Sequence, residues 1–300
     1  MDRFESMAVL LTVTQAGSLS AAGRKLGMPL ATVSRKISEL EVHVKARLLS
    51  RSTRQLTLTD AGRDYVVACK RILEDVNEAE RAASGEYSAP KGDLIITAPI
   101  VFGRLHVLPI TTEFLKAYPE VNVRLVLGDR VVNLLEDHVD LAVRIGELPD
   151  SSLIATRIGM IRRIVCGSPT YFAERGAPKS PSDLSAHQCV TFEALMSPDS
   201  WIFKVNGADV SVPIHSRLMV NTAEAAIDAA ISGVGVTRVL SYQIEGARRA
   251  DLLDVTLREF EPAPIPVSLV YTSQVRFPLK LRAFLDFAAP RLRERMNMAA

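Results

Sequence analysis

The sequence offers its clearest chemistry in one arginine that a short helix can carry into a groove of DNA. Apolar residues around Arg35 recur at +4, +3 and +4 positions, a spacing that buries one face of a helix. These apolar residues are Val33, Ile37, Leu40 and Val44. Arg35 then projects from the opposite face among small polar side chains, where a guanidinium can donate two hydrogen bonds to guanine. A charged face that contacts only solvent is the alternative interpretation.

The cysteines and histidines predict no metal centre. Cys69, Cys166 and Cys189 stand far apart without a CxxC pair, and the five histidines form no HxxxH pair. Structural zinc sites and disulfide frameworks need such closely spaced ligands or paired cysteines. We therefore expect neither a metal nor a cofactor, and the odd cysteine count fits a reducing compartment.

Charge is distributed unevenly along the 300 residues, although the whole chain has a formal net charge of only +2. Residues 17–59 carry eight basic side chains against two acidic ones, a net charge of +6, whereas residues 60–89 have a net charge of −3. A small basic head is thus followed by an acidic segment, and the head is the part expected to meet a polyanion. The length predicts about two domains of ordinary globular composition.

The head is predicted to contain three helices and a wing. Helices are expected over residues 3–15, ended by Gly17, and over 19–26, capped by Ser18; a third has Pro29 as its first residue. Alternation over residues 56–59 predicts a strand that follows an arginine-bearing wing tip. The candidate DNA contacts are Ser18, Ser20, Arg24, Ala31, Thr32, Ser34, Arg35, Lys36, Ser38, Arg51, Thr53 and Arg54.

The run from Ser18 to Gly62 resembles the winged helix-turn-helix of LysR-type transcriptional regulators. The residues that carry the resemblance are Ala21, Ala22, Leu26, Val33, Ser34, Arg35, Ile37, Leu40, Glu41, Leu48, Arg51, Leu58, Thr59 and Gly62. Lys45 and Leu49 stand where the family often has Gly and Phe, so we expect the third helix to end differently here. Leu30 replaces a common Gln, so base contacts of that Gln are not transferred to it.

A long helix beginning at Asp60 is predicted to follow the wing, with Thr59 as its cap. Its apolar residues alternate +4 and +3 spacings, which favours a coiled-coil-like pair of helices. They are Tyr65, Cys69, Ile72, Val76, Ala79 and Ala83. The resemblance implies that this is the linker helix through which two heads dimerise.

The rest of the chain predicts a mostly parallel α/β domain with two lobes. Strands are expected at 94–98, 121–127 and 139–145, with helices after the first two. A second lobe has a strand at 164–166, a hairpin turn at Asn206–Gly207 and a helix over 222–231; a strand at 267–271 and a helix over 277–288 return to the first lobe. This pattern resembles the effector domain of LysR regulators, itself similar to periplasmic solute-binding proteins. The predicted domains are 1–60, 61–89 and 90–300, with lobe I at about 92–162 and 266–300 and lobe II at about 163–265.

Ligands of such sheets bind outside the carboxyl ends of strands. Helix N-termini at these ends predict a small anionic ligand such as an organic acid. The candidate effector contacts are Thr97, Ala98, Pro99, Ile100, Val101, Phe102, Gly128, Arg144, Ile145, Gly146, Thr191, Phe192, Asn221, Thr222, Val236 and Thr237. Each of them also fits a turn or a core position. Arg144 is placed to pair with a ligand carboxylate, or instead with Asp140 or Glu147.

These features together predict a ligand-responsive transcription factor. Dimeric or tetrameric copies are expected to bind double-stranded promoter DNA, with RNA polymerase as a possible partner, and ligand binding is expected to change the spacing of the heads. The alternatives are a redox-responsive regulator that uses Cys166 and Cys189, and a solute-binding or enzymatic protein with a basic head. No GxSxG, HExxH or Walker pattern supports catalysis. Without an unbroken apolar span or a secretion signal, we expect no membrane association and a cytoplasmic location.

Overall fold

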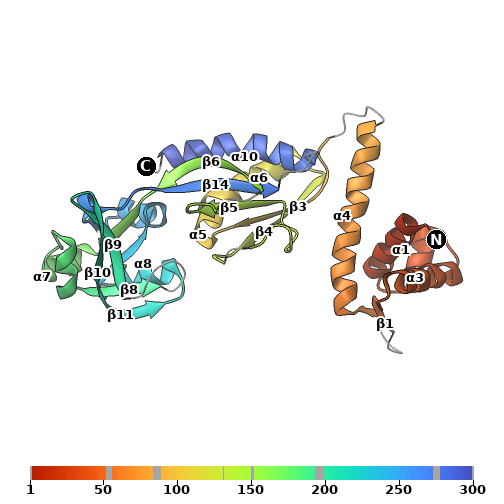
Figure 1. The fold of residues 1–300 in the computed structure, drawn as a ribbon, viewed down its shortest axis with the longest axis horizontal. Coiled ribbons are helices and arrows are strands. Elements are labelled where there is room, and N and C mark those ends of the chain that lie inside the picture. The colour runs from red at the N-terminus through yellow and green to blue at the C-terminus, as the bar shows by residue number, and fades with distance from the viewer. Residues whose placement is uncertain are drawn as a thin grey trace. The chain divides into compact units, whose positions relative to one another are not determined.

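The computed structural model describes residues 2–51, 56–83, 89–130, 132–149, 152–192, 199–272 and 278–298, in two compact units divided after residue 88 (Figure 1). The elements of the first unit are α1 (Arg3–Ala16), α2 (Leu19–Leu26), α3 (Leu30–Val44), β1 (Leu49–Arg51), β2 (Leu56–Leu58) and α4 (Asp60–Ala83). This order is a winged helix-turn-helix followed by a long helix, as predicted.

Local capping explains where the head helices begin and end. The Ser18 hydroxyl accepts the N–H of Ala21 at 3.1 Å, and Gly27 ends α2 with a positive φ of 66°. Pro29 precedes α3 rather than forming its first helical residue, which corrects the prediction. Its carbonyl instead accepts the N–H of Thr32 at 2.9 Å and so begins the first turn.

Helix α3 ends at Lys45, which adopts the left-handed conformation with φ 54° and ψ 31°. The expectation that this helix ends differently from a glycine-capped one is therefore wrong. The N–H groups of Lys45 and Ala46 donate to carbonyls of the last turn, as in a glycine cap. Beyond the cap, the Glu41 carboxylate accepts the N–H groups of Leu48 and Leu49 at 2.8 and 3.0 Å, which ties the wing to α3.

The wing is a short antiparallel pair of β1 and β2, and Thr59 caps the helix that follows it. The Thr59 hydroxyl accepts the N–H of Gly62 at 2.9 Å, which confirms the predicted cap of α4. Gly62 lies so close to the Leu48 carbonyl that a side chain has no room there. The wing tip with Thr53 and Arg54 lies outside the described residues.

The apolar seam of α4 packs first on its own head. Cys69 is fully buried in the head core, and Tyr65 and Ile72 pack against the same core. Beyond them, Val76 is half-buried and Ala79 is exposed. The prediction that the whole seam faces a second helix is therefore wrong for its first half, which completes the hydrophobic core of the head.

Lobe I of the second unit is a five-stranded sheet in the order β4-β3-β5-β14-β6, covered by helices (Figure 1). Its elements are β3 (Gly92–Ala98), α5 (Ile100–Phe102), the π-helical turn η1 (Gly103–Val107), α6 (Leu108–Ala117), β4 (Val121–Leu127), β5 (Leu141–Ile145), β6 (Leu153–Ile161), β14 (Ile265–Thr272) and α10 (Leu279–Met298). Strand β3 pairs in parallel with β4 and β5, whereas β14 pairs antiparallel with β5 and β6. The sheet is thus mixed rather than mostly parallel.

Two predicted helices of lobe I differ in the structure. No helix follows β4 within the described residues, where a hydrogen-bonded turn at 134–138 leads to β5 instead. Helix α10 runs past its predicted end at 288 to Met298, although Pro290 lies inside it. Residues on both sides of the proline, Phe284 and Leu292 among them, are buried against the lobe I core, and this packing outweighs the lost backbone hydrogen bond.

Lobe II repeats the mixed arrangement with the order β11-β8-β12-β7-β13. Its elements are β7 (Arg163–Gly167), α7 (Pro169–Arg175), η2 (Pro181–Ala186), β8 (Gln188–Phe192), β9 (Ser200–Val205), β10 (Ala208–Pro213), β11 (His215–Val220), α8 (Ala223–Ile231), β12 (Val236–Leu240), η3 (Ser241–Ile244), α9 (Glu245–Arg249), β13 (Asp254–Thr256) and η4 (Arg258–Phe260). Asn206 and Gly207 both have positive φ and close the predicted hairpin. Arg238 attaches that hairpin to the sheet, because its guanidinium stacks over Phe203 and donates to the Ile202 carbonyl at 2.6 Å.

The left-handed cap at Lys45 predicts a stabilising substitution. Lys45→Gly removes the steric penalty of a positive φ and is expected to stabilise the head by about 0.5–1 kcal/mol after the larger chain entropy of glycine is counted. Hydrogen exchange of α3 amides in the full chain measures this as slower exchange. Lys25→Gly, inside right-handed α2, is the matched control and is expected to accelerate exchange in the head. Equal effects of the two substitutions would contradict the explanation.

Candidate functional site

The exposed face of α3 presents Arg35 opposite the buried residues of the same helix. Val33 and Ile37 are fully buried, whereas the Arg35 side chain is 66% exposed. Among the residues that the structure describes, it forms an ion pair with Glu39, one turn along, at 3.2 Å. A surface ion pair of this kind contributes at most about 1 kcal/mol, so a stronger acceptor can draw the guanidinium away. Among the neighbours predicted beside it, Ala31 and Ser38 are exposed.

The other predicted DNA contacts divide into exposed and engaged side chains. Ser20 and Arg24 are exposed on α2, whereas Ser18 is occupied as the cap of that helix. Lys36 is only 15% exposed and forms an ion pair with Glu5 of α1. Thr32 and Ser34 are half-buried, and Arg51 ends strand β1 beside the undescribed wing tip.

One exposed residue of the head was missed from the sequence. Leu30 is 50% exposed at the first position of α3, where an apolar side chain gains nothing by contacting water. Its position next to a proline offered only a weak signal, because exposure of a single leucine is not readable from periodicity. In the structure it stands at the N-terminal end of the same helix that carries Arg35.

The predicted effector hydroxyls are held by hydrogen bonds inside the sheets. The Thr97 hydroxyl donates to the Val126 carbonyl at 3.0 Å, and the Thr237 hydroxyl donates to the Val190 carbonyl at 3.0 Å. The Thr191 hydroxyl bonds to a serine of β11 at 2.7 Å. All three side chains are buried, and their hydroxyl groups are engaged in hydrogen bonds within the fold.

Further predicted effector contacts belong to the two lobe cores. Ala98 and Phe102 are buried in the core of lobe I, whereas Phe192 and Val236 are buried in the cores of lobe II. The candidate residues that keep partial or full exposure are Pro99, Ile100, Gly128, Arg144, Ile145, Gly146, Asn221 and Thr222.

Charged groups at the strand ends of lobe I already have partners. The guanidinium of Arg144 donates to the Val132 carbonyl at 2.6 Å, and its desolvation lowers the pKa of this arginine. Asp140, one of its two predicted intramolecular partners, accepts the N–H of Ile95 at 2.7 Å. The N–H of Ile100, at the start of α5, donates to the Asp129 carboxylate at 3.1 Å, so a protein carboxylate occupies this helix N-terminus.

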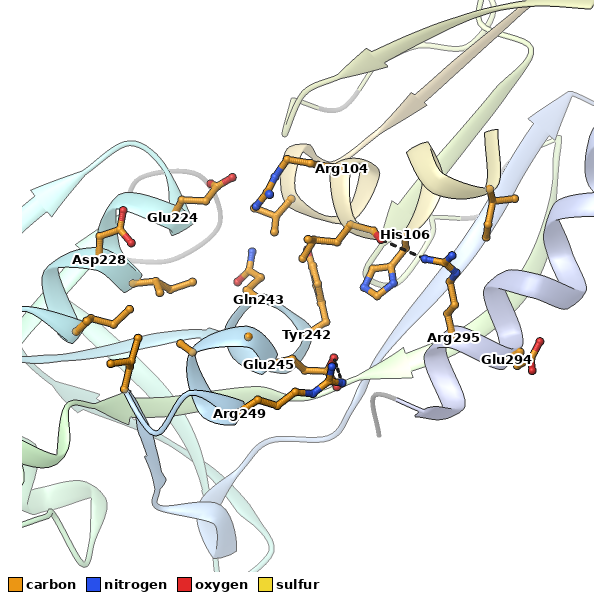
Figure 2. Close-up of a pocket in the computed structure, with 18 of the residues that line it drawn as sticks. Arg104, His106, Glu224, Asp228, Tyr242, Gln243, Glu245, Arg249, Glu294 and Arg295 are labelled. Atoms are coloured by element: carbon orange, nitrogen blue, oxygen red, sulfur yellow. Dashed lines mark hydrogen bonds and ion pairs between the residues drawn. The ribbon is translucent and has the colours of Figure 1, made fainter. Parts of the chain in front are cut away.

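A cavity of about 980 Å³ opens between residues of lobe I and lobe II (Figure 2). It is lined by η1, α6 and α10 on one side and by α8, η3 and α9 on the other. Val101 is the only predicted effector contact among its lining residues. Phe102, His106 and Tyr242 form an aromatic group beside it, with ring centroids 4.8 to 5.5 Å apart. No residue spacing predicts this cavity, because its walls come from segments that are distant in the chain.

Two family models match the chain, one for each of its functional parts. The first, described as "Bacterial regulatory helix-turn-helix protein, lysR family", matches residues 4–63, and "LysR substrate binding domain" matches residues 88–293. The chain belongs to the LysR family of transcriptional regulators. This confirms the resemblance, and the protein is a DNA-binding regulator with an effector-binding domain.

Relatives and solved structures support the family along nearly the whole chain. The HTH-type transcriptional activator AaeR of Escherichia coli is 30% identical over 95% of this chain and 93% of its own length. The regulator CrgA of Neisseria meningitidis is 31% identical to this chain in its solved structure, which covers 96% of this chain and 98% of its own with a TM-score of 0.62. Full-length AphB of Vibrio cholerae is 26% identical, covers 95% and 98% respectively, and has a TM-score of 0.61.

The three thiols of this LysR-family chain are buried. Cys166 and Cys189 are fully buried on opposite sides of the lobe II sheet, in separate hydrophobic cores, with strand β12 between their strands. Burial raises the pKa of each thiol to about 12, and the pKa of Cys69 to about 11. This environment suppresses the thiolate that oxidation requires and keeps the two lobe II cysteines from bridging. Within the described residues there is also no cluster of metal-ligating side chains and no helix long and apolar enough to cross a membrane.

Burial of the three thiols predicts that they react slowly with thiol reagents in the folded protein. A colorimetric disulfide reagent at pH 8 is expected to leave all three cysteines unmodified in the native chain and to modify all three in denaturant. Ser185→Cys, at an exposed position of η2, is the positive control and is expected to react at once. Rapid native modification of Cys166 or Cys189 would restore the redox-responsive alternative.

Proposed function

We propose that α3 enters the major groove of promoter DNA and that Arg35 reads a base pair there. The observation that carries this proposal is the exposure of Arg35 opposite the buried face of α3, with only a surface carboxylate beside it. The guanidinium matches the two acceptors of guanine. Leu30, exposed at the start of the same helix, is suited to contact the methyl group of a thymine.

The remaining contacts of the head are proposed to position it on the phosphate backbone. Ser20 and Arg24 are exposed on α2, which precedes the recognition helix. Arg51, Thr53 and Arg54 are proposed to contact the backbone or minor groove from the wing. Lys36, paired with Glu5, is proposed to orient α3 against α1 rather than to touch DNA directly.

Two heads are proposed to read two half-sites as a dimer, and effector domains to join dimers into a tetramer. The second half of the α4 seam supports this, because Val76 and Ala79 keep exposure that the head core does not use. A two-fold pair of heads requires half-sites about one DNA turn apart, 34–36 Å, or a multiple of it. The protein is proposed to act in the cytoplasm as a regulator without catalytic activity, and contact with RNA polymerase is a further proposal.

A small effector is proposed to bind at the strand ends between the lobes and to change the spacing of the heads. Support comes from the candidate residues that keep exposure on both lobes, including Gly146 of lobe I and Asn221 of lobe II. An organic acid is the proposed class, with Arg144 as its cationic partner. A ligand changes the conformational equilibrium only as far as it prefers one lobe arrangement. The Asp129 carboxylate at α5 opposes an anion at that helix end, so the proposed contact lies nearer to Arg144.

Replacement of Arg35 tests the DNA-binding proposal. An operator is first selected from random duplexes, and affinities of the full chain are measured at fixed salt on that operator and on unrelated DNA. Arg35→Ala is expected to lose about 1–3 kcal/mol on the operator and less on unrelated DNA. Arg24→Ala is the matched control, expected to weaken both complexes alike. An equal loss on both duplexes for Arg35→Ala would reduce this residue to a phosphate contact.

Thermal unfolding with a panel of small organic acids tests the effector proposal. An acid at a hundred times its dissociation constant is expected to add about 2.7 kcal/mol to stability. The shift is expected to weaken in Arg144→Ala and Asn221→Ala, because both side chains are proposed ligand contacts. Asn77→Ala, exposed on α4, is the control that is expected to keep the full shift. An absent shift across the panel would refute an acidic effector.

A further inference from the structure

The cavity between the lobes has a lining that differs from that of the strand-end cleft proposed above. Its volume of about 980 Å³ is large enough for a small organic molecule, and only Val101 belongs to both sites. Its walls come from two lobes of the same compact unit, so a molecule inside it contacts both. Apart from Val101, the residues of this lining belong neither to the DNA-binding face nor to the proposed effector contacts.

The two walls carry unpaired charges of opposite sign. On lobe I, Arg104 is exposed and has no ion pair with any described residue. On lobe II, Glu224 and Asp228 lie one turn apart on α8, and they too have no ion pair within the described part of the chain. Figure 2 shows the Arg104 guanidinium and the Glu224 carboxylate pointing toward one another across the cavity.

The other charged residues of the lining balance one another more closely. Arg291 and Arg295 lie 3.7 and 4.0 Å from the Glu113 carboxylate, and Arg249 pairs with Glu245 at 3.2 Å. Glu294 also lines the cavity from α10 (Figure 2). The charges left to a ligand are therefore chiefly one cation on η1 and two carboxylates on α8.

A buried polar atom without a partner lies at the same cavity. His106 is 9% exposed, and its Nε2 has no hydrogen-bond partner. Desolvation, with Arg295 nearby, lowers the pKa of this histidine to about 4, so the ring is neutral at pH 7 and can donate or accept. A buried unpaired ring nitrogen is unfavourable, and a polar ligand atom would satisfy it once a small shift of the lining opens the enclosed Nε2 to the cavity. His106 lies in the π-helical turn η1, an irregularity that often occurs at functional sites.

Aliphatic side chains complete the lining between the charged groups. Ile110 comes from lobe I, and Ile227, Ile231 and Leu252 come from lobe II. A ligand that uses the whole site therefore needs an anionic group, a cationic group and an apolar part.

We propose that this cavity binds a zwitterionic ligand of the amino-acid type with an aliphatic side chain. Its carboxylate pairs with Arg104, its ammonium group pairs with Glu224 and Asp228, and His106 Nε2 makes a further polar contact. The aliphatic side chain packs against the isoleucines. Because these contacts come from both lobes, binding favours one separation of the lobes.

Isothermal calorimetry with the full chain tests the need for both charges. The probes are L-leucine, 4-methylpentanoate, which lacks the ammonium group, and 3-methylbutylamine, which lacks the carboxylate. L-leucine is expected to bind saturably, and each analogue is expected to bind at least tenfold more weakly. Equal binding of leucine and either analogue would overturn the proposal, as would the absence of saturable leucine binding.

Charge-neutralising variants test whether leucine binds in this cavity. Arg104→Gln and Glu224→Gln are each expected to weaken leucine binding at least tenfold. Arg175→Gln and Glu174→Gln, both exposed on α7 away from the cavity, are matched controls expected to retain it. Unchanged leucine binding in both cavity variants would place the ligand elsewhere and overturn the proposal.

A second copy of the chain is the competing occupant of this cavity, and sedimentation of the same variants identifies it. If Arg104→Gln or Glu224→Gln produces smaller assemblies while leucine has no effect on any variant, the surface belongs to self-association and the ligand proposal fails. Thermal shifts from organic acids that depend on Arg144 are independent of either result, so the strand-end proposal succeeds or fails separately.

Discussion

The head depends on one small hydrophobic core that helices α1 to α4 must share. A domain of about 60 residues buries so little apolar surface that it is only marginally stable, and each further buried side chain adds to its stability. Cys69 of α4 supplies part of it, which is why the first half of an apparent dimerisation seam packs within the chain. The same core buries Val33 and Ile37 and thereby turns Arg35 outward. The outward position of Arg35 and the packing of α4 are thus consequences of a single burial requirement.

Several polar side chains that were expected to bind the effector form hydrogen bonds within the effector domain instead. Thr97 and Thr237 use their hydroxyl protons on carbonyls of neighbouring strands, since a buried hydroxyl without a partner is unfavourable. Asp129 likewise satisfies the N–H at the start of α5. Sheet topology alone therefore does not tell which polar groups at a strand end are left for a ligand.

Caps and turns could be predicted from neighbouring residues, whereas sheet pairing, helix length and the cavity depend on contacts between distant segments. Ser18 and Thr59 caps and the Asn206 turn depend on residues within a few positions, and each is confirmed. The antiparallel pairing of β14 and the continuation of α10 past Pro290 depend on burial against distant segments, which periodicity does not encode. The cavity could not be predicted for the same reason, because Arg104 and Glu224 come to line the same cavity only through the fold. The left-handed Lys45 shows the converse, since the surrounding contacts impose a cap that its own residue type disfavours.

The interlobe position of the cavity has an energetic consequence for regulation. A ligand that touches only one lobe binds open and closed arrangements equally and shifts no equilibrium. A ligand held by Arg104 and Glu224 loses one of its two charged contacts when the lobes separate. Each tenfold preference for one arrangement is about 1.4 kcal/mol of coupling free energy, and this preference is available to reposition the heads. Opposite charges on opposing walls are thus a direct way to convert occupancy into a change of lobe arrangement.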